Sequence, residues 1–548
     1  MKFKGIITLC MCGAFALGVS AQTHVEGQEY FKADQFDNAK ELLTRALNNA
    51  GTDKSVANYY LGMIAVEENK LDEAGKHFAA GVQANPDYAY NYVGQGLLKL
   101  KSGDAKTAEQ DFKQADKLAK KDPGVVIAIA RAYNDVDPVA YAKQIDKNVE
   151  KARKWNMQNP DIYIFEGDRF RVQKDAGKAA GMYEMAANYD KAAAPAYVKY
   201  ASLFTRVNQD YAIKKLQELL SENPNSALGQ RELANAYYNK GDYANAAKQY
   251  AAYVNNPSHF KSDENRYAFL LFYGGDFQKG YDYATQRLNQ NPADFTAMRY
   301  QFMNAAQIPA LKDQYLTLAE NLVKTHAKNP KENRFAPIDY NLISQELSSA
   351  KKFDEAVNLL EEGIKDNPDN AALNKQLAMI YIDASDTIPN SLALAAKAFK
   401  GYIDKTEEPT YNDYIQQATF LYYAGVQDKA NASKYFDEEK TYLDKAAAAY
   451  PGFYKPNKMR GDIAKQQADK ANVEKAAAPL YEQAIAEFET IAPDKRSNAA
   501  KSDAKEMYLY LGNYYLDGGD KAKAKQMFNK YLELDPNNAD VRKFADSL

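Results

Sequence analysis

A small residue recurs along this 548-residue chain twelve positions before an alanine or a glycine. A large apolar residue often stands four positions after that alanine, and such spacings place side chains on one helical face. Because small residues let two antiparallel helices cross closely, the pattern predicts a series of helix pairs, each about 34 residues long. The spaced pairs are Gly27 and Ala39, Gly62 and Ala74, Gly96 and Ala108, Gly167 and Ala179, Ala234 and Ala246, Ala268 and Gly280, Ser344 and Ala356, and Gly512 and Ala524.

Turn residues fall where such helix pairs need them. Gly-Asp steps at Gly241, Gly275 and Gly519 lie between the two helices of a pair. Glycine can end a helix in the left-handed conformation, and the following Asp can cap the next helix. Asn-Pro steps, as at Asn159 and Asn367, lie between pairs, where proline stops one helix and its polar neighbour can cap the next.

This set of residues resembles the tetratricopeptide repeat. The resemblance implies an all-α fold, a right-handed superhelical solenoid of about fourteen helix pairs that covers most of the chain after residue 21. The positions that match the family's pattern most fully are Tyr508, Leu511, Gly512, Tyr515, Ala524, Phe528, Tyr531 and Pro536.

Some units depart from the pattern. We expect a weak second helix in the unit at 124–160 and a turn interrupted by Pro309. We also expect a long inter-helix loop at 383–391 and an insertion at 425–456. We expect one solenoid that can bend near residues 295–335, which separates an N-terminal array, 22–300, from a C-terminal array, 301–548.

The first residues have the order of a secretory signal peptide. Two lysines precede an apolar run, residues 5–19, and small residues lead up to Ala21. The run is too short for a comfortable membrane span. We therefore predict a signal peptide over residues 1–21, cleaved after Ala21. Both cysteines, Cys10 and Cys12, lie within it, so the mature chain would contain no disulfide and no cysteine metal site.

The charge balance argues against nucleic acid as a partner. The formal charge of the chain is −3, and removal of Lys2 and Lys4 gives −3 − 2 = −5, whereas nucleic-acid binders usually carry a basic excess. No later apolar run is long enough to cross a bilayer. The chain resembles exported envelope proteins of the Bacteroidetes in three features: the signal-peptide ending before Gln22, the 42 tyrosines and the Asn-Pro turns. This resemblance implies the periplasm as the destination.

No catalytic or metal-binding signature stands out. The chain has no Gly-rich phosphate loop, nucleophile elbow or paired-histidine zinc helix. The four histidines, His24, His77, His259 and His326, are far apart, and we interpret each as a surface or groove residue. We predict no catalytic residues, no metal and no cofactor.

A solenoid instead offers a concave surface, which the first helix of each pair lines in the tetratricopeptide family. The resemblance implies a groove that is apolar and aromatic at first and then becomes polar and charged. The alternative is that Tyr59, Met63 and Leu97 pack against the next repeat. The candidate groove residues are Tyr59, Met63, Val66, Tyr90, Val93, Leu97, Arg131, Asn134, Asp168, Arg171, Arg231, Asn235 and Tyr238.

Three hypotheses for the function follow. The first is a non-catalytic periplasmic scaffold that binds envelope proteins or peptides through the groove. The second is a glycan- or peptidoglycan-binding envelope protein, because tyrosine rings can stack on sugars. The third is an enzyme with a site near 425–456. Thr387 and Ser547 also stand in triplets similar to the O-glycosylation motif of Bacteroidetes, and Thr387 is the candidate site. The oligomeric state is open.

Overall fold

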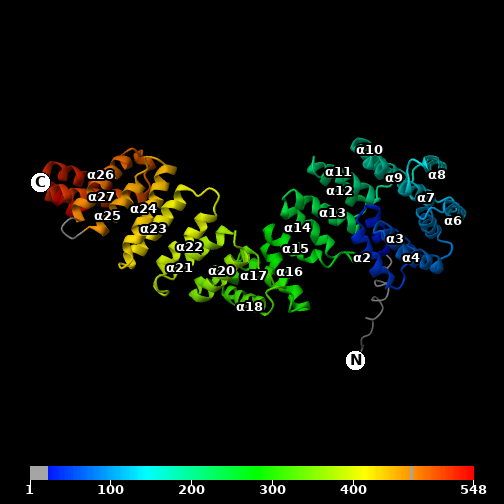
Figure 1. Cartoon of the computed structure of the whole chain (residues 1–548), viewed down its shortest axis with the longest axis horizontal. Helices are drawn as coiled ribbons and strands as arrows, with labels where there is room; N and C mark the ends of the chain where they lie inside the picture. Colours follow the sequence, from blue (N-terminus) through cyan, green and yellow to red (C-terminus); the bar gives the residue numbers. More distant parts are fainter. Residues whose placement is uncertain (1–22, 469–472) are drawn as a thin grey trace, which may run out of the picture. The chain divides into compact units, whose positions relative to one another are not determined.

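The computed structural model describes residues 23–468 and 473–548. The predicted signal peptide, with Cys10 and Cys12, lies outside these residues. The described residues form 29 α-helices and two short 3-10 helices and include no strand. By their order in the chain, the α-helices make fourteen pairs and one last helix, α29 (Ala539–Asp546). The predicted all-helical solenoid of about fourteen pairs is confirmed (Figure 1).

The chain divides into two compact units, residues 1–307 and 308–548. The predicted bend near 295–335 and the division into arrays 22–300 and 301–548 stay predictions. Unit 1 begins with a helix over residues 23–32. It continues with α2 (Phe36–Leu47), α3 (Lys54–Glu67), α4 (Leu71–Ala84), α5 (Ala89–Lys101), α6 (Ala105–Leu118), α7 (Pro123–Val136), α8 (Ala142–Trp155), α9 (Pro160–Val172), α10 (Ala176–Tyr189), α11 (Ala194–Phe204), α12 (Gln209–Glu222), α13 (Ala227–Asn239), α14 (Tyr243–Tyr253), α15 (Asp263–Tyr273), α16 (Phe277–Gln290) and α17 (Phe295–Ala305).

Unit 2 has the same construction. It holds η1 (Pro309–Gln314), α18 (Tyr315–Lys328), α19 (Pro337–Ser349), α20 (Phe353–Asp366), α21 (Ala371–Asp383), α22 (Ser391–Lys405), α23 (Tyr411–Gln427), α24 (Ala432–Ala449), α25 (Lys455–Gln467), α26 (Val473–Glu489), η2 (Pro493–Lys495), α27 (Asn498–Asp517), α28 (Lys521–Leu534) and α29.

The small residues lie where the two helices of a pair cross. A Cβ atom added to Gly62 would come within 2.4 Å of the Phe78 ring, and one added to Gly512 within 2.5 Å of the Phe528 ring. Real Cβ atoms do not approach so closely, so each ring occupies the space that a larger residue would need. This contact explains why the large apolar residue follows the small one by sixteen positions.

The predicted turns are mostly as expected. Gly241 and Gly519 have φ of +80°, which favours glycine. Asp242 and Asp520 then cap α14 and α28 by accepting backbone hydrogen bonds. Asp276 makes no such bond to α16, so the cap predicted there is wrong.

Among the irregular units, the loop 384–390 and the interruption at Pro309, where η1 begins, are confirmed. The weak helix predicted within 124–160 is wrong, because α8 is a regular helix that buries Ile145, Val149 and Ala152. The insertion in 425–456 is accommodated by α23 and α24, which are 17 and 18 residues long, rather than by a separate loop.

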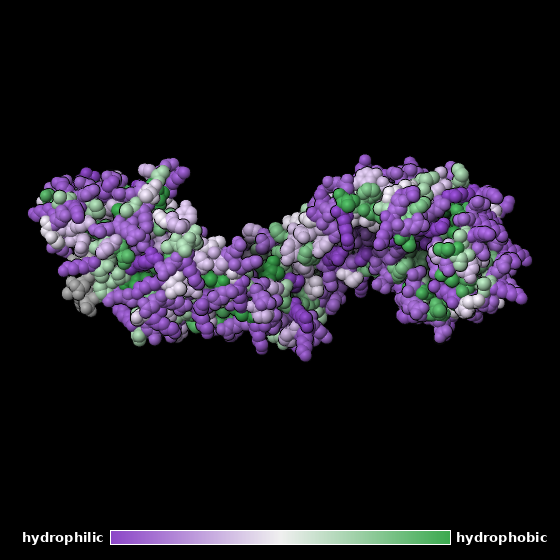
Figure 2. Space-filling view, turned by 45° about the horizontal axis from the view of Figure 1, so that its top comes forward, coloured by the Kyte–Doolittle hydropathy of each residue, from purple (hydrophilic) through white to green (hydrophobic). Residues whose placement is uncertain are grey.

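Hydrophilic residues cover most of the visible surface of each unit, with apolar residues in small patches (Figure 2). Within the described residues, no helix combines the length and apolar character that a bilayer span requires.

Candidate functional site

The first helix pair, residues 23–47, packs against helices about 200 residues further along unit 1. The Glu26 carboxylate accepts hydrogen bonds from the backbone N–H groups of Ala227 (3.1 Å) and Leu228 (3.4 Å) at the start of α13. Helix-start N–H groups lack partners within their own helix, so a carboxylate stabilises them. The Tyr30 ring meets the Phe260 ring edge-on at 5.4 Å. Gln35, just before α2, donates to Glu232 of α13 at 3.0 Å, so unit 1 closes on itself around its first helix pair (Figure 1).

Ion pairs hold the turn after residue 32 inside this closed array. Lys32 Nζ lies 2.8 Å from an Asp161 carboxylate oxygen. Asp34 accepts from Lys199 at 2.7 Å and from Arg171 at 2.5 Å. The Lys199 side chain is only 3% exposed, so its buried ammonium needs carboxylate partners to offset the cost of its desolvation.

Asp168 is the second partner of Lys199 and the centre of a buried network. It accepts from Lys199 at 2.7 Å, from Arg131 at 3.0 Å and from the Tyr183 hydroxyl at 2.9 Å. Burial acts to raise the pKa of Asp168, but the positive charges of Arg131 and Lys199 outweigh it and leave that pKa below its ordinary value. Asp168 is therefore a carboxylate at neutral pH and an ion-pair partner of both cations.

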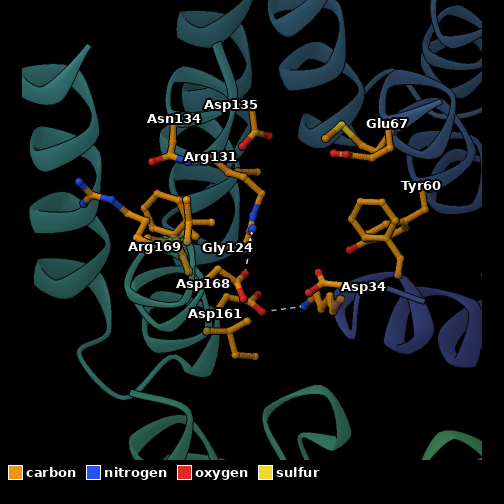
Figure 3. Close-up of a pocket in the computed structure, with 18 of the residues that line it drawn as sticks. Asp34, Tyr60, Glu67, Gly124, Arg131, Asn134, Asp135, Asp161, Asp168 and Arg169 are labelled. Atoms are coloured by element: carbon orange, nitrogen blue, oxygen red, sulfur yellow. Dashed lines mark hydrogen bonds and ion pairs between the residues drawn. The ribbon is translucent and has the colours of Figure 1, made fainter. Parts of the chain in front are cut away.

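A cavity of about 590 Å³ lies between the first helix pair and helices α3, α5, α7 and α9 (Figure 3). We call it the N-terminal pocket. Aromatic side chains form the side nearest to α3, and α7 and α9 supply charged side chains. Its volume is in the range of sites that hold small molecules or peptide side chains. The lining includes Phe31, Lys32, Asp34, Tyr59, Tyr60, Met63, Glu67, Tyr90, Arg131, Asn134, Asp135, Asp161, Phe165, Asp168, Arg169, Arg171 and Val172.

The structure brings together seven of the thirteen candidate groove residues at the N-terminal pocket. Three others are buried in the helix packing and do not line it: Val66, Val93 and Leu97. Tyr59, Met63 and Leu97 are all buried, with exposures of 5%, 4% and 1%, and the choice between groove lining and packing against the next repeat stays a prediction. Partner binding by any of these residues stays a prediction. The seven at the pocket are Tyr59, Met63, Tyr90, Arg131, Asn134, Asp168 and Arg171.

The last three candidates, on α13, make contacts within the chain. Arg231 binds Asp263 at 2.6 Å. Asn235 accepts a hydrogen bond from Arg266 at 3.0 Å, and the Arg266 guanidinium lies 5.2 Å from the Tyr238 ring centre. These contacts connect α13 to α15 rather than to the N-terminal pocket.

Sequence reasoning missed several residues of the site. Lys199 had a usable signal, because it is the single charge in the apolar helix α11 and such a charge needs a buried partner. Asp34, Glu67 and Asp135 had none, since each belongs to an ordinary polar helix end or turn.

The described residues contain no cluster of three metal-ligating side chains. His326 was expected at the surface or in the groove, which is wrong. It is buried, stacks on Phe335 at 4.1 Å and lies 2.8 Å from a Glu362 oxygen. Thr387 and Ser547 are exposed, and their O-glycosylation stays a prediction.

Comparison with sequence families identifies the repeats. Two family models, both described as tetratricopeptide repeat, match residues 24–89 and 210–259, and residues 505–538. The chain is a tetratricopeptide-repeat (TPR) protein. TPR folds serve as scaffolds for interactions between proteins. Curated proteins gave no match to this TPR protein.

Solved structures of several TPR proteins are similar in architecture. The C-terminal part of a TPR repeat-containing protein from Cytophaga hutchinsonii is 16% identical, with a TM-score of 0.40 over 51% of this chain and 98% of its own. Yeast Tom70 is 16% identical, with a TM-score of 0.26 over 94% of this chain and 99% of its own. A TPR protein of Thermus thermophilus is 19% identical, with a TM-score of 0.23 over 39% of this chain and 98% of its own. These similarities are too low to transfer any binding partner.

Proposed function

We propose that this TPR protein is a non-catalytic periplasmic scaffold that binds partner proteins or peptides through the concave surface of unit 1. The observation that carries the proposal is the N-terminal pocket. It combines a cavity of about 590 Å³, aromatic walls and charged side chains within the closed array. A cavity of this composition suits a protruding side chain of a partner polypeptide.

The support for export is the sequence of residues 1–21, and the support for a non-catalytic role is the TPR architecture. Export has a direct test. Mass spectrometry of the protein from the periplasmic fraction should find an N-terminus at Gln22. A chain that keeps residues 1–21 and stays in the cytoplasm would contradict export.

Partner binding is tested by crosslinking the tagged full chain in its native cells and identifying captured proteins by mass spectrometry. Val172 suits the perturbation because it lines the N-terminal pocket and is 80% exposed. Val172→Asp should therefore leave the fold intact and place a charge at the pocket. Val207→Asp is the matched control, since Val207 is 78% exposed and outside the pocket.

We expect a small set of envelope proteins that Val172→Asp loses and Val207→Asp retains. Capture no richer than an untagged control would refute the scaffold. Retention on purified cell-wall sacculi instead would favour the glycan-binding hypothesis.

A further inference from the structure

We infer that the N-terminal pocket receives a lysine or arginine side chain of a partner polypeptide, held between the Glu67 and Asp135 carboxylates beside the aromatic wall. The inference rests on the proposed function, since it specifies the partner's chemistry for the same groove.

The two carboxylates face the pocket from different helices. Glu67 is the last residue of α3, and Asp135 is the next-to-last residue of α7. Figure 3 shows both carboxylates directed into the pocket from opposite walls. Neither has an ion-pair partner within residues 23–468 and 473–548, and the side chain that hydrogen-bonds Asp135 is the neutral amide of Asn134.

The cations of the pocket are already engaged. Arg131, Arg171 and Lys32 each form an ion pair with an aspartate. The guanidinium of Arg169 lies 5.8 Å from the Phe165 ring centre, and Figure 3 shows it directed away from Glu67. Among the described residues, therefore, no cation forms an ion pair with Glu67 or Asp135, although Arg131, paired with Asp168, still attracts both carboxylates.

The pKa shifts agree with this geometry. Burial raises the pKa of Glu67, and the charge of Asp135 raises it further. Burial likewise raises the pKa of Asp135, against the opposing charge of Arg131. Lys101 also lowers both pKa values, but it forms no ion pair with either carboxylate among the described residues. A bound cation would remove the repulsion between the two carboxylates.

The aromatic wall fits the same ligand. The Phe31 and Tyr60 rings lie 5.1 Å apart, and the Tyr59 and Tyr60 rings 4.9 Å apart. Aromatic faces attract ammonium and guanidinium groups, and the apolar stems of lysine and arginine pack against such rings. An acidic segment would add charge of the same sign to the Glu67 and Asp135 carboxylates.

The test uses the purified full chain and pools of nine-residue peptides, in which the central residue is Arg, Lys, Ala or Glu and the others are randomised without cysteine. We expect the Arg and Lys pools to be retained at least tenfold more than the Ala and Glu pools, and higher salt to reduce the preference. Glu67→Gln with Asp135→Asn should abolish it. Glu109→Gln with Asp146→Asn is the matched control. Both residues are exposed and lie outside the pocket, and the two substitutions remove the same charge.

Equal retention of the four pools, or an unchanged preference in the Glu67 and Asp135 variant, would overturn the inference. Crosslinking in cells separates this failure from that of the proposed function. If Val172→Asp loses the partners while the Glu67 and Asp135 variant keeps them, the scaffold function stands and the cationic ligand is wrong. If the unaltered chain captures no partner, both are wrong.

Discussion

Removal of the buried cation Lys199 should destabilise unit 1 less than removal of its carboxylate partner Asp168. Lys199→Met takes away an ammonium that is 3% exposed and donates to Asp34 and Asp168 at 2.7 Å each. Burial alone suggests the opposite ranking, because the Asp168 side chain is 12% exposed.

The ranking follows from the charges that remain. After Lys199→Met, Asp168 keeps Arg131 and Asp34 keeps Arg171, so two carboxylates face two guanidinium groups. The loss is two charge-assisted hydrogen bonds, partly offset by the lower desolvation cost of Met, and we expect about 1–2 kcal/mol. After Asp168→Asn, Lys199 and Arg171 share the single carboxylate of Asp34, and Arg131 keeps no ion pair and only the attraction of Asp135 and Asp34. Leaving a buried charge without compensation costs about 3–5 kcal/mol, and the partial exposure of Arg131 favours the lower end.

Urea unfolding followed by circular dichroism at pH 7 measures both variants, and hydrogen exchange of residues 23–34, α9 and α11 locates the loss. Lys178→Met is the control. Its ion pair with Asp175 is exposed, so the variant should change the unfolding free energy by less than about 1 kcal/mol. A Lys199→Met variant at least as destabilised as Asp168→Asn would refute the charge-balance reasoning.

Two further perturbations test the helix crossing in unit 1 and a buried carboxyl in unit 2. Gly62→Val should destabilise unit 1 by about 2 kcal/mol or more, because a Cβ at residue 62 meets the Phe78 ring at 2.4 Å. In the double variant, Phe78→Ala should relieve part of this strain, so the two losses of unfolding free energy should not add. Additive losses in urea unfolding would contradict the close contact. In unit 2, Glu439 is buried, neither carboxylate oxygen has a partner among the described residues, and burial raises its pKa to about 9. Because this pKa is higher in the folded state than the unfolded value near 4.5, the carboxyl contributes stability that is present below pH 4.5 and is lost as pH rises toward 9. Glu439→Gln should therefore flatten the decline of the melting temperature between pH 5 and 9. An unchanged slope would contradict a buried, protonated carboxyl.

The fold was predictable because its determinants are local. Gly62 and Phe78, or Gly512 and Phe528, are sixteen residues apart and belong to one helix pair, so a single sequence shows the pattern directly. The error at α8 has the same origin. Its core positions, Ile145 and Val149, have helical spacing but do not carry the alanine and the large residue that stand four positions apart in helices such as α4 and α28.

The site was only partly predictable because its determinants are far apart in the chain. Tyr59 and Leu97 both belong to the first helices of their pairs, yet only Tyr59 lines the N-terminal pocket. The difference depends on the position of the first helix pair, which is set by contacts such as that of Glu26 with Ala227. No periodicity reports a contact between residues 201 positions apart.

The closure of unit 1 has a consequence for the order of folding. Successive helix pairs can form as the chain is synthesised, because each contacts mainly its neighbours. The first pair differs, since Glu26 and its partner Ala227 are separated by 201 residues. At about 5–20 residues per second, the ribosome needs about 10–40 s to make that stretch. Throughout this time the first helix pair lacks the surface on α13 against which it packs, so its docking is a late step. Nascent chains that end before α13 would expose the first helix pair to chaperones and proteases.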